Sequence, residues 1–72
     1  MAPTDHELRV FATVLTTGSY TDAAQRLGLP THRVRYRVHR LYGKLGALDK
    51  GTAAIALGWC QVPDDLLDGG TR

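Results

Sequence analysis

Residues 33–46, RVRYRVHRLYGKLG, concentrate side chains that can bind phosphates and base edges. Arginine can make two parallel hydrogen bonds to guanine or phosphate, and histidine and tyrosine can donate to the same groups. Six basic residues lie between Ala23 and Leu48 with no acid among them: Arg26, Arg33, Arg35, Arg37, Arg40 and Lys44. A solvated helix face normally mixes both signs of charge, so we favour a DNA-binding face over a merely solvated one.

Hydrophobic residues in the same stretch recur at spacings of four, three and four: Val34, Val38, Leu41 and Leu45. This period predicts a helix over about residues 30–45 with one buried face. The side chains that point away from that face are His32, Tyr36, His39, Arg40 and Gly43, with Arg33 and Arg35 at its edges. We expect this second face to enter the major groove of duplex DNA.

The candidate DNA-binding residues divide by position, because the N-terminal part of a recognition helix goes deepest into the groove. We assign base edges to Thr31, His32, Arg35 and Tyr36. Arg33 and Arg40 suit either a base or a phosphate, and His39 lies on the same face. Phosphate contacts are expected from Arg37, Lys44, Ser19, Tyr20 and Thr21.

Three further helices are expected, over residues 5–16, 20–27 and 50–59, and no strand pattern is present. Thr4 and Glu7 form a T-x-x-E capping box, and Ser19 caps the next helix with Asp22 three residues on. The segment AAQRLGLPTHRV, residues 23–34, then supplies a small contact at Ala24, a turn at Gly28 and a core anchor, as a helix-turn-helix requires. The sequence therefore predicts an all-α, four-helix helix-turn-helix domain.

Two family resemblances follow from these motifs. Residues 8–46 resemble the N-terminal helix-turn-helix of LysR-type regulators without a gap, through L-x-x-F, G-S-Y-T-x-A-A, R-L-G-L and the closing R-L…L-G. Residues 4–11, TDHELRVF, and residues 39–59, HRLYGKLGALDKGTAAIALGW, resemble the two ends of a LuxR or GerE-type domain. We favour the four-helix LuxR/GerE-like plan for the whole chain, because a LysR-type protein would continue into a long linker helix. Both resemblances imply that Arg35 and Tyr36 read DNA and that Thr31 and His32 enter the groove first.

The expected fourth helix is hydrophobic almost all round, so part of it must be covered. By the LuxR resemblance, Ile55 and Trp59 are candidates for a two-fold dimer interface. Closure of the monomer core is the equally weighted alternative, because 72 residues supply little core.

Composition sets the remaining expectations. With 43% hydrophobic and 22% charged residues, the chain forms one globular domain over residues 1–60, followed by a flexible acidic tail over residues 61–72. No stretch is long and apolar enough to cross a membrane, no signal segment opens the chain, and we expect a cytoplasmic, nucleoid-associated protein. Cys60 is expected to be a buried or half-buried apolar residue. No catalytic or metal-binding pattern is present, so we expect neither an enzyme nor a cofactor.

The predicted function is that of a small transcriptional regulator that binds double-stranded DNA in a sequence-specific way, as a homodimer. A protein-binding adaptor is the alternative, with the fourth helix or the acidic tail docking on a larger regulator or polymerase. A DNA-binding accessory of recombination or mobile-element control would present the same surface, and the sequence does not separate it from a regulator.

Overall fold

The computed structural model describes residues 2–63 and 66, and it is all-helical over them. Four helices follow one another: α1 (Asp5–Thr17), α2 (Tyr20–Leu27), α3 (Thr31–Leu45) and α4 (Lys50–Leu57). The predicted fold class is confirmed. None of the helices in this described part is long and apolar enough to span a membrane. Asp64, Asp65 and Asp68, which define the predicted acidic tail, lie outside the described residues.

The helices begin where the sequence places their caps. The Thr4 hydroxyl accepts a hydrogen bond from the Glu7 amide, and the Glu7 carboxylate accepts one from the Thr4 amide, which completes the capping box. The Ser19 hydroxyl accepts from the Asp22 amide at 3.0 Å. At α4, Asp49 and Thr52 form a second capping box. Pro30 precedes α3 without a side-chain cap.

The ends of α2, α3 and α4 share one arrangement. A glycine in the left-handed conformation ends each helix, and the amide after it donates back to a carbonyl five residues earlier. At α4 this glycine is Gly58, with φ of +74°, and the Trp59 amide donates to the Ala54 carbonyl at 2.9 Å. The helix expected over residues 50–59 therefore ends at Leu57, and Trp59 lies beyond it.

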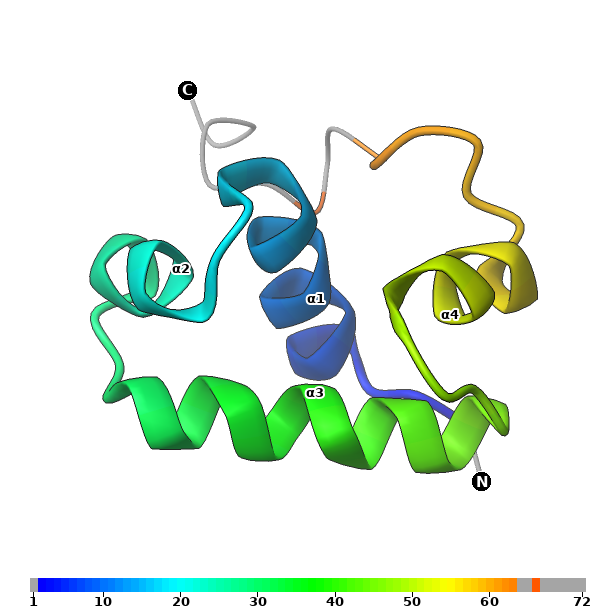
Figure 1. Cartoon of the computed structure of the whole chain (residues 1–72), viewed down its shortest axis with the longest axis horizontal. Helices are drawn as coiled ribbons and strands as arrows, with labels where there is room; N and C mark the ends of the chain where they lie inside the picture. The colour runs from blue at the N-terminus through cyan, green and yellow to red at the C-terminus, as the bar shows by residue number, and fades with distance from the viewer. Residues whose placement is uncertain (1, 64–65, 67–72) are drawn as a thin grey trace.

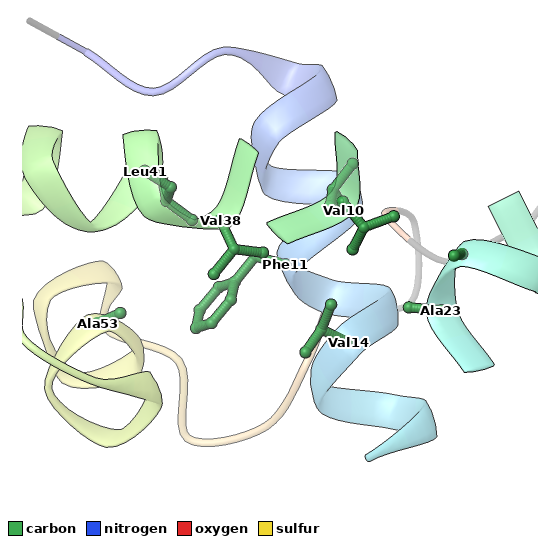
Figure 2. Packing of buried hydrophobic residues seen from close by; sticks show 9 residues of the cluster. Val10, Phe11, Val14, Ala23, Val38, Leu41 and Ala53 are labelled. Atoms are coloured by element: carbon green, nitrogen blue, oxygen red, sulfur yellow. The ribbon is translucent and has the colours of Figure 1, made fainter. Parts of the chain in front are cut away.

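Trp59 returns to the core instead of extending the helix. Its ring stacks on Phe11 with centroids 5.7 Å apart, and Tyr42 meets the same Phe11 ring edge-on at 5.9 Å. Phe11 is fully buried, with its ring between α3 and α4 (Figure 2). Ala53 of α4 is fully buried as well. The structure thus uses α4 to close the monomer core, and it covers one face of the Trp59 ring with Phe11, while the dimer contact predicted for Trp59 stays a prediction. Cys60, expected to be at least half-buried, is exposed.

The other helices leave one long side of α3 uncovered. Figure 1 shows α1, α2 and α4 on the same side of α3, with α2 near its beginning and α4 near its end. The small side chains of Ala23 and Ala24 are buried, which lets α2 approach its neighbours closely. Val34, Val38 and Leu41 fill the covered side of α3 and are fully buried.

Two chemically identical substitutions test this division between core and surface. Leu41→Ala, at a fully buried position, is expected to lower the free energy of unfolding by about 2–5 kcal/mol, because it removes apolar contacts and leaves a cavity. Leu48→Ala, at a position 91% exposed, should change it by less than about 0.5 kcal/mol when the protein is dilute enough to be a monomer. Urea unfolding followed by circular dichroism measures both. Equal losses would contradict the assigned core.

Candidate nucleic-acid interface

The uncovered side of α3 carries the predicted recognition face. Its exposed residues are His32, Arg33, Arg35, Tyr36, His39, Arg40 and Gly43, whereas Thr31 at the first turn is half-buried. These seven are the residues that the helical period places away from the apolar stripe, so the predicted orientation of α3 is confirmed. Leu45 is only half-buried, because the stripe runs out at the end of the helix.

Arg35 connects this face to the start of α2. Its guanidinium carbon lies 5.3 Å from the centre of the Tyr20 ring, within the range of a cation–π contact. The neighbouring Ser19 hydroxyl accepts from the Asp22 amide, so its own proton is free to donate, and Thr21 is exposed. The structure therefore brings Tyr20, the middle of the three hydroxyl-bearing residues predicted at the start of α2, against Arg35.

Tyr36 and Arg40 form a pair one turn further along. The Nη1 of Arg40 donates to the Tyr36 hydroxyl at 3.3 Å, and the guanidinium carbon of Arg40 lies 5.8 Å from the centre of the Tyr36 ring. Tyr36 remains 59% exposed. The two side chains thus face solvent as one unit.

Beneath this pair lies an acid that the sequence interpretation used only as a helix cap. Glu7 of α1 is 4% exposed, and its Oε1 accepts from the Lys44 ammonium at 2.8 Å and from the Thr4 amide at 3.0 Å. Its Oε2 lies 3.8 Å from the Nε of Arg40. Burial by itself raises the pKa of Glu7, but the hydrogen bonds from Lys44 and Thr4, with the charges of Lys44 and Arg40, lower it overall.

Lys44 already has a partner within the fold, and the phosphate contact predicted for it from the sequence stays a prediction. Its side chain is 10% exposed and its ammonium is paired with Glu7, so withdrawing it for DNA would leave a buried carboxylate with a weaker partner. The pairing of Lys44 within the fold could have been suspected from its position in the sequence. Lys44 follows Leu41 by three residues and precedes Leu45, so it lies at the edge of the apolar stripe.

Arg37 lies at the same edge of the stripe, seven residues before Lys44. Its side chain is half-buried, and among the described residues its Nε is a buried nitrogen with no hydrogen-bond partner. A buried unpaired donor is costly, so a phosphate oxygen that reached it would be well bound. The predicted phosphate role of Arg37 stays a prediction.

A shallow groove continues the face from α3 toward α4. Tyr20, His39, Tyr42 and Lys50 line it together with the α3–α4 turn. Burial, followed by the nearby Tyr20 hydroxyl, raises the pKa of Tyr42 to about 12, so this phenol stays neutral and able to donate. Lys50 was missed from the sequence, because it stands outside the cationic stretch and reaches the groove only through the turn.

Comparison with known proteins places this architecture in context. Residues 6–48, more than half of the chain, match the model of the bacterial regulatory helix-turn-helix proteins of the lysR family. This match supports the LysR-type resemblance, and it does not support the LuxR/GerE-like plan favoured from the sequence. No curated protein matches the chain. No solved structure matches it either.

The lowered pKa of Glu7 has a consequence for stability. A carboxyl with a depressed pKa in the folded state stabilises the fold above its unfolded pKa, near 4.5, and this contribution is lost as the pH falls through the folded value. We expect the free energy of unfolding of the wild-type protein to fall more steeply below about pH 4.5 than that of Glu7→Gln/Lys44→Met, which lacks both members of the buried pair. Urea unfolding at a series of pH values measures both slopes. Parallel curves would contradict the buried ion pair.

Proposed function

Because the chain belongs to the lysR family of bacterial regulatory helix-turn-helix proteins, we propose that α3 enters the major groove of duplex DNA and reads a specific sequence there. The family match supports DNA binding in transcription regulation at a coarse level. We further propose which side chains of α3 read the sequence. We also propose that two copies bind DNA together, and that the protein acts by binding and not as an enzyme.

One observation carries the proposal: the exposed face of α3 carries three arginines and no acid, and the other helices lie away from it (Figure 1). An α-helix fits the major groove of B-DNA, and basic side chains displace counterions from the phosphates. A helix that needed only solvent on this side would gain from mixed charges, yet no acid occurs from Ala23 to Leu48.

The depth of each residue in the groove follows from its place along α3. Thr31, His32, Arg35 and Tyr36 lie in the first half of the helix, and we assign them to base edges. Arg33 and Arg40 lie at the sides of the face and suit the flanking phosphates, to which Ser19, Tyr20, Thr21 and Arg37 add further contacts. Lys50 extends this set along the groove beside α4.

We assign the dimer contact to α4. Ile55 is 79% exposed on the side of α4 that does not meet the core, and Leu48 in the preceding turn is 91% exposed. Burying these side chains against a second copy would remove apolar surface from water. Two copies would then present two α3 helices to half-sites about one turn of DNA apart.

Selection from a random duplex library at near-physiological salt tests the proposal as a whole. We expect enrichment of an inverted repeat with half-sites about one helical turn apart. A protein that enriches no sequence and binds only at low salt would contradict sequence reading and would favour the protein-binding adaptor, with Ile55 and Leu48 facing another protein.

A charge-matched pair of variants tests the role of α3. Arg35→Gln should weaken binding to the selected site by about 5- to 100-fold, the range for losing one bidentate base contact. Arg9→Gln removes the same charge from an exposed position on α1 and should change binding little. Fluorescence anisotropy with labelled duplexes measures both. Equal losses would mean that net charge, and not a contact from α3, sets the affinity.

The dimer has its own test. Ile55→Asp should leave the helical circular dichroism spectrum unchanged, because the position is exposed, while shifting sedimentation equilibrium toward monomer. Leu48→Asp serves as a second variant at the edge of the same surface. A wild-type protein that sediments as a monomer at micromolar concentration and on its DNA site would contradict this interface.

A further inference from the structure

The Glu7 carboxylate stands at the centre of a network that the proposed function does not use. It is buried on α1, outside the DNA-binding set, yet two residues of α3 reach it: Lys44 at 2.8 Å and Arg40 at 3.8 Å. Lys44 is buried with it, whereas the Arg40 side chain is 49% exposed and continues to the surface. Arg40 is thus the group through which Glu7 can act on a ligand.

We propose that Glu7 is a positioning residue that holds Arg40 against Tyr36 and thereby sets the Tyr36 hydroxyl as a hydrogen-bond donor toward a base or phosphate acceptor. This inference rests on the proposed function. It adds a specificity-determining residue on a helix that does not enter the groove. It also assigns the Tyr36 hydroxyl the role of hydrogen-bond donor to the ligand.

The geometry of the guanidinium supports the first step. Its five donors point in fixed directions in one plane, so a carboxylate near Nε restricts how the rest of the group can turn. In this structure Nε faces Glu7 while Nη1 donates to the Tyr36 hydroxyl at 3.3 Å. The guanidinium therefore has an ion-pair contact on its Nε side and one hydrogen bond through Nη1, and its remaining donors are left for a phosphate.

The second step follows from the hydrogen-bonding capacity of a phenol. The Tyr36 oxygen accepts from Arg40, so the hydroxyl proton is directed away from Arg40. Tyr36 is 59% exposed on the recognition face, and its proton points to whatever acceptor lies there. In the major groove, guanine N7 and O6, adenine N7 and thymine O4 accept, whereas the cytosine amino group does not. Tyr36 should therefore prefer an accepting base and disfavour cytosine.

The substitution Glu7→Gln removes the charge and keeps the capping box, because a glutamine oxygen can still accept from the Thr4 amide. It would leave Lys44 buried beside a neutral amide, which can unfold the domain. We therefore compare Lys44→Met with Glu7→Gln/Lys44→Met, so that no unpaired ammonium remains in either protein. In Lys44→Met the Glu7 carboxylate keeps the Thr4 amide and Arg40 as partners, and circular dichroism checks that both proteins are folded. Asp5→Asn in the same Lys44→Met background is the charge-matched control, since Asp5 is an exposed acid of the same helical turn.

The test measures the ratio of dissociation constants for the selected duplex and a shuffled one. Glu7→Gln should reduce this ratio by about tenfold relative to Asp5→Asn, as expected for one lost oriented base contact. In a Tyr36→Phe background, where the hydroxyl is absent, Glu7→Gln should have no further effect, which a double-mutant cycle measures. A structural role alone would lower the melting temperature without this dependence on the hydroxyl.

Two results would overturn the inference and leave the proposed function intact. One is an unchanged ratio for Glu7→Gln when the wild-type protein discriminates; the other is an equal loss with and without the Tyr36 hydroxyl. A wild-type protein that binds both duplexes alike would overturn the proposed function and this inference with it.

A measurement on the free protein, without DNA, tests the inference independently of the proposed function. The ¹⁵Nε chemical shift of Arg40 in the free protein should move on Glu7→Gln in the Lys44→Met background, because the Glu7 carboxylate lies 3.8 Å from Nε, while Asp5→Asn leaves it in place. An unchanged shift with Glu7→Gln would overturn the action of Glu7 on Arg40.

Discussion

The Glu7–Lys44 ion pair joins the first turn of α1 to the last turn of α3 across 37 residues of sequence. It lies where the apolar stripe of α3 ends and Leu45 is only half-buried. Apolar contacts fix how closely two helices approach, but they are non-directional, whereas a buried pair at 2.8 Å tolerates only a narrow range of rotations about the helix axis. The rotation of α3 decides which side chains face solvent, so the recognition face depends on this crossing.

Phe11 holds the other side of the same crossing. It is fully buried (Figure 2), and the rings of Tyr42 and Trp59 meet it from α3 and from the segment after α4. A core this small gains much of its burial from a few aromatic contacts. The return of Trp59 explains why an apolar fourth helix is present: α4 and the residue after it complete the core of one subunit, while Ile55 on the other side stays exposed.

Local sequence rules predicted most of the fold. Thr4, Ser19 and Gly28 fix helix ends through hydrogen bonds and backbone geometry within a few residues, and the helical period placed Val34, Val38 and Leu41 in the core. The extent of the fourth helix was predicted wrongly. Trp59 was assigned to a helix because its neighbours are hydrophobic, although Gly58 is the residue type that ends helices.

The charges of the site show a further limit. Lys44 carries the same charge as the arginines beside it, and only its position at the edge of the stripe distinguishes it. Its partner, Glu7, lies in another helix, so the charges along α3 alone cannot show that this lysine forms an ion pair within the fold. The same long-range contact gives Arg40 its orientation. Ion pairs with other helices therefore decide which basic residues of α3 remain available to bind a ligand.

Titration of ¹⁵N-labelled protein with the selected duplex tests the central claim, that α3 with the start of α2 is the DNA-binding surface. The account predicts that the largest amide shift changes fall at residues 19–21 and 31–40, with the buried residues 10–14 of α1 changing little. Changes centred on α4, with residues 31–40 unaffected, would contradict it.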